Sequence, residues 1–212
     1  MTVNYLVNHI PTSTPLERRT GRRITATTIT IHNTGNPTST AANERDWLTN
    51  PSNKRKASWH IVVDENVAIE AVPLNERALH AGDATGNNTS IGVEICESGD
   101  YGKTLDNAAT LVAKLLKERG WGVDRLRRHY DWSGKICPRL MYDGGEWTGW
   151  AAFKDAVQAK LDEGAITVKA EDANAIIAKY LQPAYASAKT KAEKDEAHRL
   201  AEALRKASGQ KK

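Results

Sequence analysis

A chain of 212 residues with 40% hydrophobic and 26% charged residues can form one substantial globular domain with a small appendage. Its two cysteines, Cys96 and Cys137, exclude a disulfide scaffold, although one bridge stays possible by count. No stretch approaches the roughly 18 apolar residues of a membrane helix, and the first residues do not resemble a secretory signal. We therefore expect a protein made in the cytoplasm, without membrane insertion.

The net charge of +4 is unevenly distributed along the chain. Residues 165–212 carry 10 Lys/Arg against 6 Asp/Glu, which leaves residues 1–164 balanced at 20 against 20. A neutral body with a basic tail is typical of a tail that meets an anionic surface, such as cell-wall polymer or nucleic acid. A solvated helical face is the alternative.

The first predicted elements are a strand and a short helix. Residues 27–32 (Thr-Thr-Ile-Thr-Ile-His) alternate with a period of two, so they predict a strand that ends at His32. The glycine- and proline-containing segment 33–37 breaks it. A helix is expected over 41–48, after a cluster of Ser and Thr residues that can cap it.

Two further strands should follow a basic loop at 54–56. Segment 58–63 predicts one strand and 67–72 its return strand, with a turn between them. Residues 80–90 have the composition of a loop.

The segment 90–96 predicts a strand with two different faces. Three apolar side chains alternate with small or polar ones, and Glu94 lies among the latter. A carboxylate in this position either has a cationic partner or faces an open site. The alternative is an edge-strand glutamate that points to solvent.

Helical periodicity returns in the second half of the domain. A stripe over 105–116 predicts a helix capped by Thr104 and closed by Gly120, and a stripe over 150–161 predicts another that ends near Gly164. Strands mixed with amphipathic helices predict an α/β domain over residues 1–163.

Residues 164–212 form the second expected region. Their Ala-, Lys- and Glu-rich composition predicts a small helical hairpin, with Pro183 as the break between its two helices. The longer helix should turn these side chains inward: Tyr185, Ala188, Ala192, Leu200 and Leu204. Such a hairpin has little core, so we expect it to pack on the first domain or on a partner.

His32, His129 and Cys137 are candidate metal ligands. Zinc binds imidazole nitrogen and thiolate sulfur, and a catalytic zinc has three protein ligands with a fourth position left for water. The spacing alone leaves open that each residue is buried for structural reasons.

The sequence resembles the type-2 N-acetylmuramoyl-L-alanine amidases, which include phage endolysins and prophage or bacterial autolysins, with animal peptidoglycan-recognition proteins as distant relatives. The resemblance covers about residues 20–160. It rests on five strings in the same order: His-Asn-Thr-Gly-Asn (32–36), Ser-Trp-His-Ile-Val-Val-Asp (58–64), His-Ala-Gly-Asp (80–83), Asn-Thr-Ser-Ile-Gly-Val-Glu-Ile-Cys (88–96) and His-Tyr-Asp-Trp-Ser-Gly-Lys-Ile-Cys-Pro (129–138).

The resemblance implies a central mixed β-sheet flanked by helices, with one zinc ion at one end of an open groove. It matches His32, His129 and Cys137 to the zinc ligands. Lys135 matches the catalytic lysine and Glu94 the catalytic carboxylate. The implied reaction is hydrolysis of the amide bond between N-acetylmuramic acid and L-alanine, with Glu94 as general base.

Substrate contacts are expected from His80, Trp59 and Arg139. His80 could equally be a structural loop residue, and Trp59 a core aromatic. Arg139 follows the Cys-Pro pair and is expected to meet a stem-peptide carboxylate.

The resemblance implies bacterial peptidoglycan as the partner and does not call for nucleic acid. A non-catalytic peptidoglycan-recognition module is the alternative function, and a regulator that binds another protein is a second one. The region 164–212 is expected to bind anionic cell-wall polymer, or else to stabilise the enzyme by docking. Without an export signal, the protein is expected to reach the wall as a phage endolysin does, through a holin.

Overall fold

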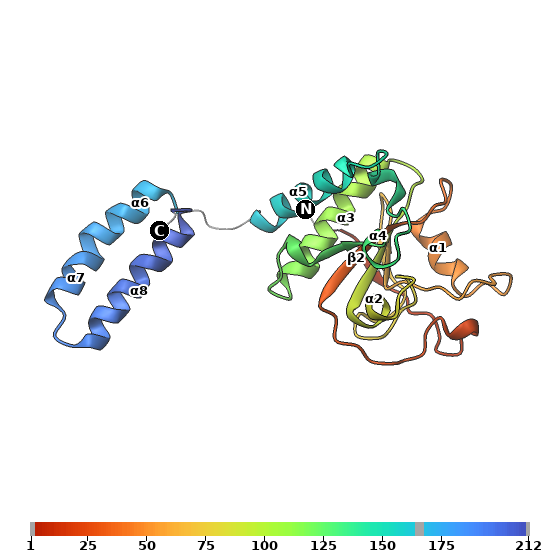
Figure 1. Cartoon of the computed structure of the whole chain (residues 1–212), viewed down its shortest axis with the longest axis horizontal. Coiled ribbons are helices and arrows are strands. Elements are labelled where there is room, and N and C mark those ends of the chain that lie inside the picture. The colour runs from red at the N-terminus through yellow and green to blue at the C-terminus, as the bar shows by residue number, and fades with distance from the viewer. Residues whose placement is uncertain (1–2, 164–167, 211–212) are drawn as a thin grey trace. The chain divides into compact units, whose positions relative to one another are not determined.

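The computed structural model describes residues 3–163 and 168–210. The chain divides into two compact units, Met1–Glu163 and Gly164–Lys212 (Figure 1). The last helix of the first unit ends at Asp162, and Gly164, near which its end was expected, lies outside the described residues. Within these residues, no helix is both long and apolar enough to cross a membrane.

The first unit is built on a six-stranded mixed sheet, in the order β1-β4-β3-β5-β2-β6. Only β3 and β4 pair in antiparallel fashion, and the other neighbours are parallel. This confirms the predicted α/β architecture with a mixed sheet. The strands are β1 (Tyr5–Val7), β2 (Thr28–Asn33), β3 (Ile61–Val63), β4 (Ala68–Glu70), β5 (Ser90–Ile95) and β6 (Leu126–Arg128).

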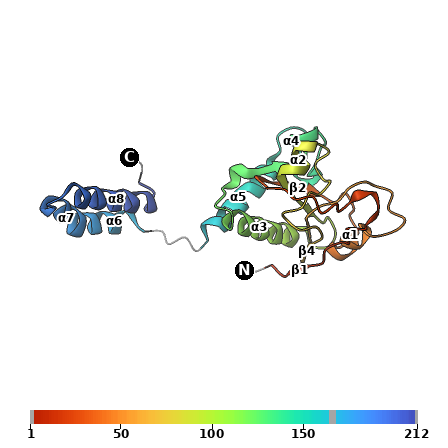
Figure 2. The same ribbon diagram turned by 90° about the horizontal axis from the view of Figure 1, so that it is seen from below.

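Two long helices cover one face of this sheet. The helices α3 (Tyr101–Lys117) and α5 (Thr148–Asp162) lie side by side (Figure 2). Their apolar stripes and the isoleucines and valines of β2 and β5 share one buried core. Alternation along the strands therefore sends the other set of β2 and β5 side chains to the opposite face.

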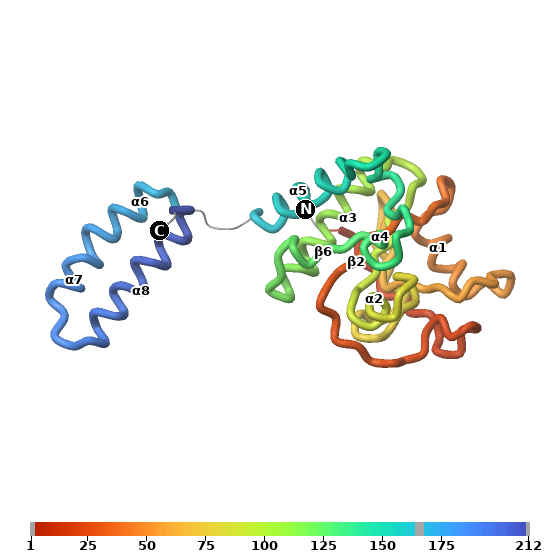
Figure 3. Tube along the Cα trace, viewed as in Figure 1, coloured from red at the N-terminus to blue at the C-terminus, as the bar shows by residue number. Residues whose placement is uncertain are grey.

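The opposite face carries short helices and long loops. These are α1 (Ala41–Trp47), α2 (Ala84–Thr89) and α4 (Tyr130–Ser133). Three 3-10 turns also occur, at Pro15–Glu17, Val123–Arg125 and Arg139–Met141, and the last two contact α5. A second, smaller core packs α1 against β3 and β4. Figure 3 follows the long segment between β1 and β2 around the outside of the unit.

The predicted start of one helix was wrong, and another helix was predicted as a loop, both for local reasons. Helix α3 begins at Tyr101, because the Asp100 carboxylate caps it by accepting from the Lys103 amide, and Thr104 is buried inside the helix. The expected loop at 80–90 contains α2, which Asp83 caps by accepting from the Gly86 amide. A six-residue helix is too short to show helical periodicity.

The second unit is a helical hairpin, as predicted, but its turn lies elsewhere. Its helices are α6 (Ala170–Ile176), the π-helical segment η4 (Ile177–Leu181), α7 (Gln182–Ser187) and α8 (Lys191–Ala207). Pro183 lies in the first turn of α7, where its missing N–H is tolerated, so the chain turns at 188–190 instead. Tyr185 and Leu200 are exposed, contrary to the prediction, and the contact is made mainly by alanines: Ala173, Ile177, Ala197 and Ala201.

A buried arginine fixes the loop between α1 and β3. The Arg18 side chain is fully buried and donates from Nε, Nη1 and Nη2 to the carbonyls of Arg55, Leu48 and Asn53, at 2.9, 2.9 and 2.6 Å. The Asn53 side chain also accepts from the Arg55 amide at 2.9 Å. The backbone of this loop is therefore held from inside the protein.

We expect Arg18→Met to lower the free energy of unfolding by about 3 kcal/mol, because three carbonyls lose a buried charged donor. Urea unfolding followed by circular dichroism measures the change. Arg22→Met is the matched control, since Arg22 is exposed, and should stay within about 0.5 kcal/mol of the parent. A loss below about 1 kcal/mol for Arg18→Met would show that the loop between α1 and β3 does not depend on Arg18.

Candidate metal centre and active site

The pairing of β2 with β5 sets the centre of the site. These parallel strands are in register, so His32 lies directly beside Glu94 near the carboxyl ends of both strands. Both side chains belong to the face opposite α3 and α5. Glu94 therefore lies on the predicted face of its strand, opposite the apolar side chains.

The turn around α4 brings two more candidate residues to His32. The His129 amide donates to the Ile31 carbonyl at 3.3 Å, which attaches the start of the turn to β2. The Tyr130 amide donates to the Cys137 carbonyl at 3.1 Å and closes the turn. Gly134 allows this with a φ of 74° at the end of α4.

His32, His129 and Cys137 form a buried group whose ligand atoms all lie within 4.8 Å of one another. The two Nδ1 atoms are 3.1 Å apart, and the Cys137 Sγ lies 3.8 Å from the His32 Nδ1. Tetrahedral zinc would separate such atoms by about 3.3 to 3.6 Å. The donor set and its spacing therefore fit zinc. Both cysteines are free, so no disulfide competes for Cys137.

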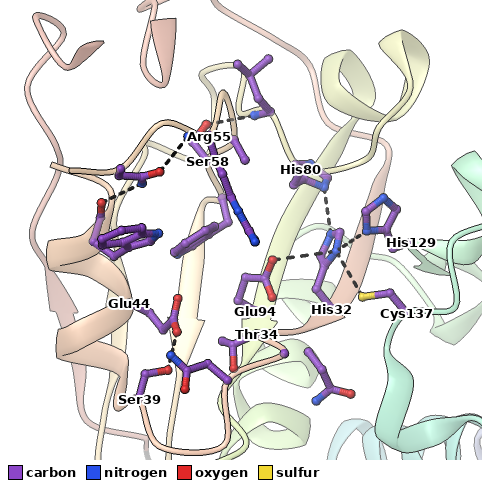
Figure 4. Close-up of a pocket in the computed structure, with 18 of the residues that line it drawn as sticks. His32, Thr34, Ser39, Glu44, Arg55, Ser58, His80, Glu94, His129 and Cys137 are labelled. Atoms are coloured by element: carbon purple, nitrogen blue, oxygen red, sulfur yellow. Dashed lines mark hydrogen bonds and ion pairs between the residues drawn. The ribbon is translucent and has the colours of Figure 1, made fainter. Parts of the chain in front are cut away.

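Hydrogen bonds from outside the group fix the ring orientation of His32. The Nε2 of His80 lies 3.1 Å from the Ser90 carbonyl, which can only accept, so this nitrogen carries the proton. The Nδ1 of His80 is then an acceptor, and the His32 Nε2 donates to it at 3.1 Å. The His32 Nδ1 consequently keeps its lone pair, which faces His129 and Cys137 (Figure 4).

The contact between His32 and His80 requires a glycine, Gly92, on β5. A Cβ atom at Gly92 would lie 2.6 Å from the Cγ of His80, which leaves no room for a side chain. The Gly92 amide donates to the Nδ1 of His60 at 2.8 Å, and the Nε2 of His60 donates to the Glu76 carbonyl. His60 therefore supports the same region from within the sheet.

Burial keeps these histidines neutral. It lowers the pKa of His129 and of His60 to about 4 and that of His80 to about 3, and it lowers the pKa of His32 well below its ordinary value. The charge of Lys135 lowers the pKa of His129 further. Neutral imidazole is the form that binds a metal ion.

The two acidic groups of the site show the opposite shift. Burial raises the pKa of Glu94 to about 8 and the pKa of Cys137 to about 12. The Glu94 Oε1 lies 4.0 Å from the His32 Nδ1, while its Oε2 is buried without a hydrogen-bond partner. A cation held by the neighbouring nitrogens and sulfur would compensate both negative charges.

These residues lie in a groove of about 610 Å³, a common size for a ligand site. Lys135, His80 and Trp59 also line it, and the Trp59 indole N–H is buried without a partner. Both ring nitrogens of His80 are engaged within the protein. Contact of His80 or Trp59 with substrate stays a prediction.

The structure places Arg139 differently from the other predicted residues. It does not line the groove, and its guanidinium forms a two-point ion pair with Glu97. Its expected contact with a substrate carboxylate would require this pair to open. Arg55, which the sequence analysis noted only as part of a basic loop, does line the groove.

The family model of N-acetylmuramoyl-L-alanine amidases matches residues 21–140, which is more than half of the chain and includes all three candidate ligands. The chain belongs to this amidase family. It is 46% identical over 149 residues to the amidase XlyB of Bacillus subtilis (strain 168), covering 67% of this chain and 45% of XlyB. It is also 46% identical over 140 residues to the amidase CwlA of the same organism, covering 63% and 49%.

The chain thus spans about half the length of these curated relatives. Solved amidase domains match more fully. The catalytic domain of XlyA is 37% identical with a TM-score of 0.66, covering 73% of this chain and 99% of that domain. The PlyG catalytic domain is 34% identical with a TM-score of 0.65, covering 75% and 96%. The amidase fold is therefore shared across the first unit.

We expect the metal-free protein to lose stability as the pH falls from 7 to 5. Buried His32, His60, His80 and His129 resist protonation that the unfolded chain accepts near pH 6.5, so each contributes a loss of about 2 kcal/mol. Glu94 acts in the opposite direction, because its raised pKa favours folding until the pH rises through about 8. Between pH 7 and pH 5, the stability lost through the four histidines exceeds the stability gained through Glu94.

Urea unfolding in the presence of a chelator, at several pH values, measures this dependence. A stability that is unchanged or higher at pH 5 would contradict the burial of neutral histidines.

Proposed function

We propose that this protein hydrolyses the amide bond between N-acetylmuramic acid and L-alanine in peptidoglycan, with one zinc ion per chain. The observation that carries the proposal is the buried group of two imidazole nitrogens and one thiol beside Glu94, whose Oε2 is buried with no hydrogen-bond partner among the described residues. Membership of the amidase family supports the choice of substrate.

His32, His129 and Cys137 would hold the metal ion. Bound zinc lowers the pKa of water toward about 7 and polarises a carbonyl group. The protein's own contribution is to present two nitrogen lone pairs through fixed tautomers and to bury the ligands in a groove that substrate can enter. Three protein ligands leave the fourth position for water or substrate.

Glu94 is the proposed general base and acid. Its Oε2 has no hydrogen-bond partner within residues 3–163 and 168–210, so this atom is free to accept a proton from the attacking water. Its raised pKa suits a group that next delivers the proton to the leaving amine of L-alanine. No covalent intermediate is needed.

Lys135 is proposed to stabilise the negative oxygen that develops on the carbonyl under attack. It lines the groove, and its charge acts on His32, His129 and Cys137. A fixed positive charge at this position favours the transition state over the neutral substrate.

The first test is an assay on purified peptidoglycan for newly freed L-alanine amino groups and for newly freed reducing sugar. We expect new amino groups without reducing ends, lost on chelation and restored by zinc. Reducing ends would indicate a glycosidase instead. Binding without cleavage under any metal would make the protein a recognition module.

Variants separate the roles in the same assay. Glu94→Gln should bind zinc but lose activity by about 100-fold or more, whereas Glu118→Gln, at an exposed position just after α3, should not change it. Cys137→Ala should lose bound zinc, and Cys96→Ala, which removes the other buried thiol, should retain it. A Cys137→Ala protein with full zinc content would contradict the ligand assignment.

We further propose a role as an endolysin whose second unit, Gly164–Lys212, binds anionic cell-wall polymer. The chain is 36% identical, with a TM-score of 0.66, to a structure described as a mutant endolysin from Bacillus subtilis. The basic charge of residues 165–212 and the exposed Tyr180 and Tyr185 support contact with a polymer. Release through a holin belongs to the same proposal.

A shortened protein that ends at Glu163 tests the second unit. We expect it to keep its activity on soluble fragments but to bind purified walls more weakly, with a smaller dependence on salt. Sedimentation with walls at two salt concentrations measures this. Equal binding by the full chain and the shortened protein would favour a role in docking or stabilisation.

A further inference from the structure

The groove extends well beyond the candidate metal ligands. Figure 4 shows Arg55 and Glu44 on one side, His32, His129 and Cys137 on the other, and Glu94 between them. The far side comes from α1 and the loop that leads to β3. A substrate cut beside Glu94 can therefore place its remaining part against this far wall.

The Arg55 guanidinium is an unused cation on this wall. Across residues 3–163 and 168–210 it forms no hydrogen bond and no ion pair, while the backbone N–H and carbonyl of Arg55 are both engaged. Glu44 also lines the groove and accepts from the Ser39 hydroxyl. Burial raises the pKa of Glu44 and the charge of Arg55 lowers it from a distance, but the two side chains form no ion pair. The charge of Arg55 is thus available to a ligand.

The backbone of Arg55 is fixed before any ligand binds, while its side chain is exposed. Fully buried Arg18 holds the carbonyls of Leu48, Asn53 and Arg55, and Asn53 accepts from the Arg55 amide. By contrast, Lys54 and Lys56 in the same loop do not line the groove. Lys54 donates to the Pro51 carbonyl and Lys56 pairs with Glu17. Only the middle residue of the basic loop is directed to the groove.

A second observation on this side of the groove also indicates a hydrogen-bond acceptor in the ligand. The Trp59 side chain is buried and lines the groove, and its indole N–H, which can only donate, has no partner. A guanidinium and a free indole N–H both favour an oxygen-rich, negatively charged group. A guanidinium binds a carboxylate through two parallel hydrogen bonds.

We propose that Arg55 is a specificity-determining residue that binds the free α-carboxylate of the γ-linked D-glutamyl residue, which follows L-alanine in the stem peptide. This inference rests on the proposed amidase function. Arg139, the residue expected from sequence for such a contact, is held by Glu97 outside the groove. Where this α-carboxylate is amidated, the charge that Arg55 would bind is absent.

Two soluble substrates test the assignment. One is N-acetylmuramoyl-L-alanyl-γ-D-glutamyl-L-lysine amide, and the other carries D-isoglutamine in place of D-glutamate, so the pair differs only at the α-carboxylate. For the parent protein we expect kcat/KM to be about ten-fold higher for the free carboxylate, as for a charge-assisted hydrogen bond in an open groove. Arg55→Ala should cut both substrates equally, at the parent's rate for the amidated one.

Matched variants exclude a general effect of charge or folding. Lys54→Ala removes a neighbouring positive charge outside the groove and should keep the ten-fold preference. Arg55→Lys should keep part of it. Zinc content and unfolding midpoint, measured for each variant, should match the parent.

The outcomes separate this inference from the proposed function. If Arg55→Ala lowers the rate on both substrates by the same factor, Arg55 does not read the carboxylate and the assignment fails. A parent protein that cuts purified walls but distinguishes the two fragments neither as substrates nor as competitive inhibitors also overturns it. A parent protein that cuts neither walls nor fragments overturns the amidase proposal itself.

Discussion

The register between β2 and β5 is the constraint on which the candidate site depends. Parallel pairing places His32 beside Glu94, and alternation along both strands sends them to the face opposite α3 and α5. A shift of either strand by one residue would move its own side chain, His32 or Glu94, into the apolar core. The large core on the far face therefore does more than stabilise the sheet, because it also selects the register that brings a candidate ligand and a carboxylate together.

Around His32 and Glu94, a chain of hydrogen bonds gives most buried polar groups a partner. His32 donates to His80, His80 donates to the Ser90 carbonyl, and Gly92 leaves the space that His80 occupies. In a low-dielectric interior such a network is favourable only when nearly every member has a partner. Within the described residues, three buried groups that line the groove are exceptions: the Thr34 Oγ1, the Glu94 Oε2 and the Trp59 indole N–H. A ligand in the groove would supply the missing partners.

Much of this arrangement could be predicted from sequence, and the failures have physical causes. Strand alternation predicted the face of Glu94. The five sequence strings shared with the amidases predicted the mixed sheet and the family of the protein. The partners of Arg139 could not be predicted, because its ion pair with Glu97 joins residues that are 42 positions apart. The hydrogen bonds from Arg18 to a loop 30 to 37 residues away were equally unpredictable. The break predicted at Pro183 was wrong because this residue follows a π-helical segment and lies in the first turn of α7, where its missing N–H is tolerated.

The brace from Arg18 has a consequence for how this protein can change. Its three hydrogen bonds all end on backbone carbonyls, which every amino acid possesses. Apart from Asn53, whose side chain accepts from the Arg55 amide, the path of the loop at 48–55 therefore depends little on the side chains of these residues. New side chains can therefore be tried on the wall of the groove at small cost in stability. The fold thereby separates the candidate metal ligands from a groove wall whose side chains can change independently of them.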